Sequence, residues 1–145
     1  MFRASRRVMS SAVVRRIINT PLAPEAIGPY NQAIVVDKTV YVSGQLGLDP
    51  DSGDFPGSDV ECQTKQALIN MGHILEAANS SFDKVVKTTV LLADINDYAK
   101  VNEIYAEYFT SFYPARAAFQ AGALPKAAKV EIEAIAIAGD VIDEK

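Results

Sequence analysis

The chain has 145 residues, of which 49% are hydrophobic and 22% are charged, with 8 glycines, 7 prolines and one cysteine. A chain of this length forms one domain with a sizeable core, and this composition excludes a disordered or fibrous protein. The lone Cys62 excludes an intramolecular disulfide, and one histidine with one cysteine cannot supply the usual zinc ligands. No apolar run approaches the ~20 residues of a membrane-spanning helix. We therefore expect a soluble single domain that binds no metal and no membrane.

The charge is distributed unevenly along the chain. Residues 1–16 contain five arginines and no acid, whereas the remainder holds 9 basic and 18 acidic residues. The body of the protein is therefore strongly acidic, although the net charge of the whole chain is only −4. An acidic body repels phosphate backbones, which argues against nucleic acid as a partner.

The N-terminal twenty residues allow two interpretations. They are rich in arginine, contain serine and lack acids, which is typical of mitochondrial transit peptides. Alternatively, the β-branched run VVRRII predicts that residues 13–20 form the first strand. We assign residues 1–12 to an extension or targeting segment, 13–140 to the domain and 141–145 to a tail. Whether residues 1–8 are cleaved stays open, and so does residence in the cytoplasm, the mitochondrial matrix or both.

Turn residues and β-branched runs predict the first elements after this segment. Prolines and a glycine mark residues 21–29 as a loop that ends at Tyr30. Two short strands over residues 33–36 and 39–42 form a hairpin, and Ser43-Gly44 closes the second of them. Residues 47–57 then form a long polar loop.

Helical and strand periods alternate in the rest of the chain. Ser58 or Asp59 caps a helix that runs to about Asn79, and a second helix begins at residues 94–97. Strands are expected over residues 85–92, 115–123 and 129–138. The resulting order, β-β-β-α-β-α-β-β, predicts an α+β domain in which two helices cover one face of a mixed sheet.

The last predicted strand carries apolar side chains on both of its sides. One side consists of Val130, Ile132, Ala134 and Ala136, and the other of Glu131, Glu133, Ile135 and Ile137. Two helices leave one sheet face uncovered, so apolar residues on that face indicate a partner. We infer a homo-oligomer in which sheet faces pack together.

Arg116 is the first candidate for a ligand-binding residue. It is the only arginine after residue 16, and it lies within the largely apolar stretch YPARAAF. The planar guanidinium fork fits a carboxylate or a phosphate in a way that lysine does not. The alternatives are a structural ion pair with Glu131 or Glu133, or an ordinary surface arginine.

Further candidates lie on the predicted strands and loops. Glu131 and Glu133 are spaced i, i+2 on one strand face, where a partly desolvated carboxyl can act as a general acid or base, although a solvated strand face has the same pattern. Tyr30 at its loop end and the pair Ser43-Gly44 leave room for a ligand near the backbone. Asn102 in the second helix is either a polar contact or an exposed residue.

Three motifs of this chain are distinctive: the stretch AIGPYNQA from Ala26, the stretch VYVSGQ from Val40, and Pro-Ala-Arg116 followed by Phe119, Leu124 and Val-Glu131-Ile. The first two resemble the N-terminal motifs of the RidA (YjgF) family of reactive-intermediate deaminases, and the third resembles the most specific signature of that family. The resemblance extends over about residues 13–139.

The resemblance implies a chorismate-mutase-like α+β fold and a homotrimer with active sites between subunits. Members hydrolyse 2-imino acids and their enamine tautomers to 2-keto acids and ammonia, without a metal or organic cofactor. By this resemblance Arg116 would hold the substrate carboxylate, and Glu131 would activate water or carry a proton. The pocket would be lined by Tyr30, Ser43, Gly44, Asn102 and Phe119. Many members have a cysteine where this chain has Ala118, so no role of that thiol applies here.

Two other functions stay open at this point. Some members of the family are described as endoribonucleases or translation inhibitors, which the acidic body disfavours. A non-catalytic binder of small carboxylates, or a chaperone, with the same fold is the other alternative, because a fold does not decide a function.

Overall fold

The computed structural model describes residues 11–145; the candidate targeting segment, residues 1–8, lies outside this part. The strands and helices are β1 (Arg15–Ile18), β2 (Ala33–Val36), β3 (Thr39–Leu46), α2 (Val60–Ala77), β4 (Val85–Leu92), α3 (Tyr98–Tyr108), β5 (Ala115–Gln120) and β6 (Val130–Ile137). Short 3-10 turns, at Phe82–Lys84, Ile95–Asp97 and Pro125–Ala127, connect some of them. The order of strands and helices confirms the one predicted from the sequence.

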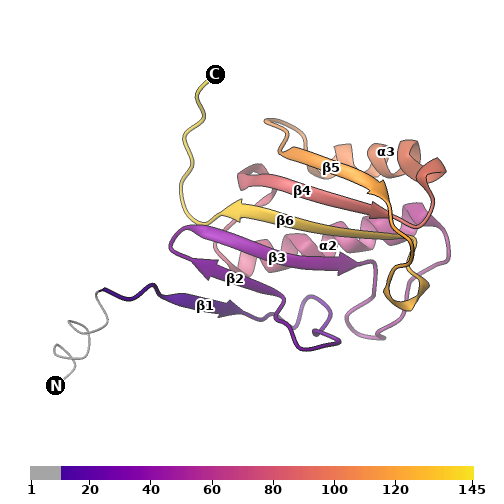
Figure 1. Ribbon diagram of the computed structural model, residues 1–145, viewed down its shortest axis with the longest axis horizontal. Coiled ribbons are helices and arrows are strands. Elements are labelled where there is room, and N and C mark those ends of the chain that lie inside the picture. Colours follow the sequence, from indigo (N-terminus) through magenta and orange to yellow (C-terminus); the bar gives the residue numbers. More distant parts are fainter. Residues whose placement is uncertain (1–10) are drawn as a thin grey trace.

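All six strands form one mixed sheet, in the order β1-β2-β3-β6-β4-β5 (Figure 1). Neighbouring strands are antiparallel except β4 and β5, which are parallel. A parallel pair needs a crossover connection, and α3 supplies it. The C-terminal strand β6 therefore lies in the middle of the sheet, between β3 and β4.

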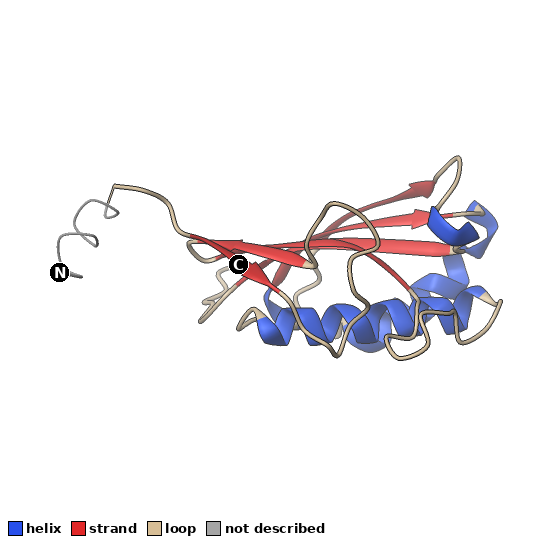
Figure 2. Cartoon of the chain, turned by 90° about the horizontal axis from the view of Figure 1, so that it is seen from below, coloured by secondary structure: helices blue, strands red, loops and turns tan. Residues whose placement is uncertain are grey.

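Both helices pack on the same face of this sheet, as Figure 2 shows. The core between the layers is a continuous apolar cluster to which both helices and five strands contribute, including Leu68, Met71, Val101, Val90, Val130 and Ile132. The predicted single α+β domain with helices on one face is thereby confirmed. No helix within residues 11–145 is long and apolar enough to cross a membrane.

Helix α2 begins and ends as its sequence predicts. The Asp59 carboxylate accepts a hydrogen bond of 2.9 Å from the Cys62 amide, so Asp59 rather than Ser58 is the cap. At the other end Asn79 has φ of 59°, in the left-handed region where asparagine is tolerated and helices often stop. The Ser80 amide then donates to the Leu75 carbonyl at 2.8 Å, which completes the last turn.

Three predicted boundaries were wrong. β3 does not close at Ser43-Gly44 but continues to Leu46, because β6 keeps pairing with it through a register shift between Val42 and Gln45. β5 ends at Gln120 and not at residue 123, and β1 spans only residues 15–18. The register shift changes the direction of the backbone at Ser43-Gly44, two residues that the sequence analysis named as candidate binding residues.

The second face of the sheet carries no helix (Figure 2). In β6 the residues that alternate with the core, Glu131, Glu133, Ile135 and Ile137, point to this face and are half-buried or exposed. Tyr41 of β3 and Phe119 of β5 lie on it with 49% and 51% of their surfaces exposed. We call this surface the uncovered face.

Candidate functional site

Arg116 leaves the sheet on the side of the helices. It pairs in register with Thr88 of β4, which is fully buried beneath α3, and side chains paired across neighbouring strands share a face. Its guanidinium carbon lies 4.8 Å from the centre of the Tyr105 ring and 5.5 Å from that of Tyr98. Its Nη2 also donates a hydrogen bond of 3.0 Å to the Tyr98 hydroxyl. Two aromatic rings and one hydroxyl therefore hold this cation.

The residues around Arg116 come from one side of α3. Tyr98, Asn102 and Tyr105 follow at spacings of four and three, which places them on adjacent turns of the helix. Tyr105 is buried, and its hydroxyl forms a hydrogen bond of 2.8 Å with the Thr88 hydroxyl. Burial raises the pKa of Tyr105. Hydrogen bonds from Asn102 and then Arg116 lower the pKa of Tyr98. Tyr98 thus links Asn102 to Arg116. We call Arg116, Tyr98, Asn102 and Tyr105 the arginine half-site.

Glu131 lies on the uncovered face, between Leu46 of β3 and Leu91 of β4. Its carboxyl is half-buried, and burial, followed by repulsion from Glu133, raises its pKa. Gly44 lies directly beside it, since a Cβ atom at that position would stand only 2.8 Å from the Glu131 Cδ. Gly44 thereby leaves the space that the Glu131 carboxyl occupies.

The loop before β2 brings Tyr30 to the same region. Tyr30 and Gly44 line one concave surface, together with Pro24, Glu25, Ala26, Ile27, Gln32, Gln45, Leu46 and Leu48. The Ser43 hydroxyl donates to the Asn31 carbonyl at 2.5 Å, and the Ser43 amide donates to the Gln32 carbonyl at 3.0 Å, so Ser43 ties this loop to β3. We call Glu131, Gly44, Ser43 and Tyr30 the glutamate half-site.

Buried Gln32 holds the loop that carries Tyr30. Its side-chain oxygen accepts from the Thr20 amide at 2.8 Å, and its nitrogen donates to the carbonyls of Thr20 and Pro24 at 3.1 and 2.9 Å. A fully bonded buried amide of this kind keeps a loop in one conformation. Tyr30 therefore sits on a braced segment despite its irregular backbone.

Within one chain the two half-sites do not meet. Arg116 points to the helix side of the sheet and Glu131 to the uncovered face, and they lie on strands separated by β4. An ion pair of Arg116 with Glu131 or Glu133, one alternative raised by the sequence, does not fit this geometry. Phe119 lies on the uncovered face with Glu131, because it alternates with Ala118, which packs against the core. One chain thus presents two separate parts of the predicted set.

Sequence reasoning missed Tyr98 and Tyr105 as neighbours of Arg116. The spacing of both tyrosines from Asn102 was a usable signal, because residues four or three positions apart on a helix are neighbours. Nothing local in the sequence, however, placed that helix face beside β5. In the part of the chain that the structure describes, no three His, Cys, Asp or Glu side chains are grouped so that they could bind a metal.

Known proteins are similar to this chain over nearly its whole length. Residues 20–138 match the family described as "Endoribonuclease L-PSP". A human protein named 2-iminobutanoate/2-iminopropanoate deaminase is 60% identical over 129 residues, which are 89% of this chain and 94% of the human one. The chain belongs to the RidA (L-PSP) family. The resemblance drawn from its motifs is thereby confirmed.

Other members of the RidA family agree in sequence and fold. "Reactive Intermediate Deaminase A, chloroplastic" of Arabidopsis thaliana is 50% identical over 92% of this chain and 71% of its own. The crystal structure of E. coli TdcF with bound serine superposes with a TM-score of 0.82 at 41% identity, covering 86% of this chain and 99% of TdcF. At these identities the common fold extends over the strands that carry both half-sites.

Proposed function

We propose that this protein hydrolyses reactive 2-imino acids, 2-iminobutanoate and 2-iminopropanoate, to 2-keto acids and ammonia. The observation that carries the proposal is the similarity, at 60% identity, to a deaminase named for these two substrates. Arg116 and Glu131, which fit the family signature, offer a cation for the substrate carboxylate and a carboxyl for acid–base chemistry. A role in removing reactive metabolites follows from the reactivity of such imines.

Arg116 fits the part of carboxylate anchor. Its guanidinium is half-buried against tyrosine rings, where a charge-assisted hydrogen bond contributes about 1.5–3 kcal/mol. A bidentate contact would also orient the substrate, so that C2 of the imine faces the attacking water. Serine bound to the relative TdcF carries the same type of α-carboxylate.

Glu131 fits the part of acid and base. Water adds to C2 of the protonated imine, and Glu131 accepts a proton from that water to give the carbinolamine. Glu131 then returns this proton to the nitrogen. Ammonia leaves as the carbinolamine hydroxyl becomes the keto group and gives its proton to Glu131. Burial and Glu133 raise the pKa of this carboxyl, which brings it closer to neutral pH, where proton transfer in both directions is efficient. Gly44, Ser43, Tyr30 and Phe119 would line this side of the pocket, and Asn102 the other.

We propose that the complete site forms between chains of a homotrimer. The opposite orientation of Arg116 and Glu131 supports this, because a carboxylate held by one cannot reach the other in the same chain. Exposed Tyr41 and Phe119 on the uncovered face also favour a partner of the same kind.

Mixing inactive variants tests the assembly. Arg116→Ala and Glu131→Gln chains are unfolded and refolded together, and keto-acid release is compared with that of each variant alone. If the two residues come from different chains, about a quarter of the sites regain both, and activity returns in that proportion. If the mixed trimers recover no activity, Arg116 and Glu131 of one site come from the same chain, and the proposed arrangement is wrong.

Keto-acid release tests the reaction. Wild type and Arg116→Ala are incubated with 2-iminobutanoate generated in situ from threonine by a dehydratase. Acceleration by wild type alone supports the deaminase proposal. If neither protein accelerates the reaction, two alternatives remain: a non-catalytic carboxylate binder, or the endoribonuclease of the family description. Binding of free keto acids would test the first, and cleavage of RNA would test the second.

The location in the cell is proposed from the N-terminal segment. Five arginines without an acid within residues 1–16 favour the mitochondrial matrix, and a start at Met9 would leave a cytoplasmic form. Fluorescent fusions with and without residues 1–8 distinguish the two. An identical distribution of both fusions would remove any targeting role from these residues.

A further inference from the structure

The hydroxyl of Tyr98 accepts a hydrogen bond from the Arg116 guanidinium. The bond runs from the guanidinium Nη2 to the Tyr98 oxygen over 3.0 Å, and Asn102, one helical turn further on, bonds to the same hydroxyl. Two donors therefore converge on one oxygen. The family signature that identifies Arg116 does not include this contact.

This hydroxyl restricts an otherwise adaptable side chain. Arginine has many rotamers, and a half-buried guanidinium on the last strand of the sheet has open space on one side. The Tyr105 ring supports one surface of the guanidinium, and its hydroxyl is shared between Thr88 and Arg116. The bond of 3.0 Å to Tyr98 fixes the direction of Nη2, and because a guanidinium has five N–H donors, further donors remain for a carboxylate.

We propose that Tyr98 is a positioning residue, whose hydroxyl orients the Arg116 guanidinium so that its remaining donors meet the substrate carboxylate. This inference rests on the proposed function, in which Arg116 is the anchor. Tyr98 acts through Arg116 and supplies no proton to the reaction. Preorganisation of this kind strengthens binding of substrate and transition state alike.

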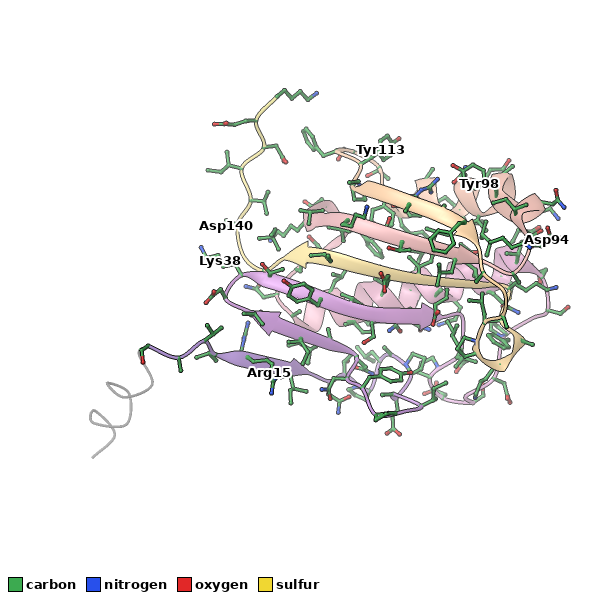
Figure 3. All side chains as sticks on the ribbon, viewed as in Figure 1. Arg15, Lys38, Asp94, Tyr98, Tyr113 and Asp140 are labelled. Atoms are coloured by element: carbon green, nitrogen blue, oxygen red, sulfur yellow. The ribbon has the colours of Figure 1, made fainter. Side chains whose placement is uncertain are left out.

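The substitution Tyr98→Phe removes the hydroxyl and keeps the ring. Tyr98 is 42% exposed, so its loss leaves the core packing unchanged. The matched control is Tyr113→Phe, which removes a hydroxyl from a tyrosine that is 71% exposed, on the loop before β5 (Figure 3). We expect Tyr98→Phe to raise KM for 2-iminobutanoate about 3- to 10-fold with kcat within about twofold of wild type. The control should change neither.

Two further measurements separate this inference from the proposed reaction. The dissociation constant for 2-ketobutanoate, measured by calorimetry, should rise by the same factor as KM, whether or not the protein hydrolyses imines. The NMR order parameter of the Arg116 Nε–H group, measured in the ligand-free protein, should fall in Tyr98→Phe and stay at the wild-type value in Tyr113→Phe. Failure of imine hydrolysis in wild type would overturn the proposed function, and the NMR comparison would still decide the role of Tyr98.

A double-mutant cycle tests whether the effect passes through the guanidinium. Lysine has no planar fork, so Tyr98→Phe should change affinity by less than about twofold in an Arg116→Lys background. An equal effect in both backgrounds, an unchanged affinity, or tighter binding in Tyr98→Phe would each overturn the positioning role. Tighter binding in particular would mean that the hydroxyl competes with the carboxylate.

Discussion

The two half-sites treat their charges in opposite ways. At the arginine half-site, a permanent cation is surrounded by groups that favour it: two aromatic rings and a hydroxyl oxygen. At the glutamate half-site, the neighbours Leu46, Leu91 and Glu133 all disfavour a negative charge, and the pKa of Glu131 rises accordingly. The first environment is suited to holding an anion in place, and the second to exchanging a proton.

The two half-sites also differ in the regularity of the backbone around them. Arg116 belongs to a regular parallel strand, and its partners come from a regular helix, so the proposed anchor is built on rigid elements. Glu131 faces the register shift at Ser43-Gly44, where the strand is irregular and the glycine lacks the side chain that would displace the carboxyl. A regular strand thus carries the proposed carboxylate anchor, whereas an irregularity makes room for the proposed acid and base.

The largest effect is expected from removal of the anchor. Arg116→Ala should lower kcat/KM for 2-iminobutanoate about 10²–10⁴-fold, because two charge-assisted hydrogen bonds to the carboxylate are lost. The protein should stay folded and keep its assembly state, as checked by circular dichroism and light scattering. Arg15→Ala on β1 is the control, and activity near wild type in Arg116→Ala would refute the anchoring role.

Neutralising the acid should act on turnover rather than on binding. We expect Glu131→Gln to lower kcat about 10²-fold, the low end of the range for general acid–base catalysis, with a much smaller change in KM. Steady-state kinetics on Arg116→Ala and Glu131→Gln would compare the effects of the two half-sites on kcat and KM. Unchanged kcat would make Glu131 a structural acid.

Adding one methyl group beside the acid should have an intermediate effect. In Gly44→Ala the new Cβ would stand 2.8 Å from the Glu131 Cδ, and the flexible end of that side chain must move away. A fall in kcat of about tenfold follows from misplacement of the carboxyl. Gly122→Ala is a matched control because its Cβ would meet no atom within 4 Å. Equal activity of the two variants would contradict the tight packing of Gly44 against Glu131.

The smallest effect concerns stability and its dependence on pH. Folding raises the pKa of Glu131, so its unfavourable contribution is absent below the pKa of the unfolded chain and complete above the pKa of the folded one. Glu131→Gln should therefore melt about 1–3 °C above wild type at pH 7, with the gap closing as the solution is acidified through both values. Thermal melts at pH 7 and pH 4 measure this. A gap that widens on acidification would reverse the assigned sign.

Periodicity and local capping were sufficient to predict the elements. Apolar spacing located both helices, Asp59 capped α2, and β4 spans residues 85–92 as predicted, because each of these features depends on neighbours within a few positions. Arg116 and Glu131 were candidates from their residue types and spacing, and the resemblance to the family then implied their roles. Residue types and short spacings thus determined the α+β class and the candidate chemistry.

Tertiary structure decided how those elements are combined. Ser43-Gly44 looked like a strand end, yet β6, from the far end of the chain, continues the pairing across it. The register of β5 against β4 turned Arg116 toward Tyr98 and away from Glu131. Strand register depends on contacts between residues distant in sequence, and a shift of one position sends every side chain to the other face. The sequence therefore indicated which groups are candidates for the chemistry, and only the folded sheet determined that one chain presents them on opposite sides.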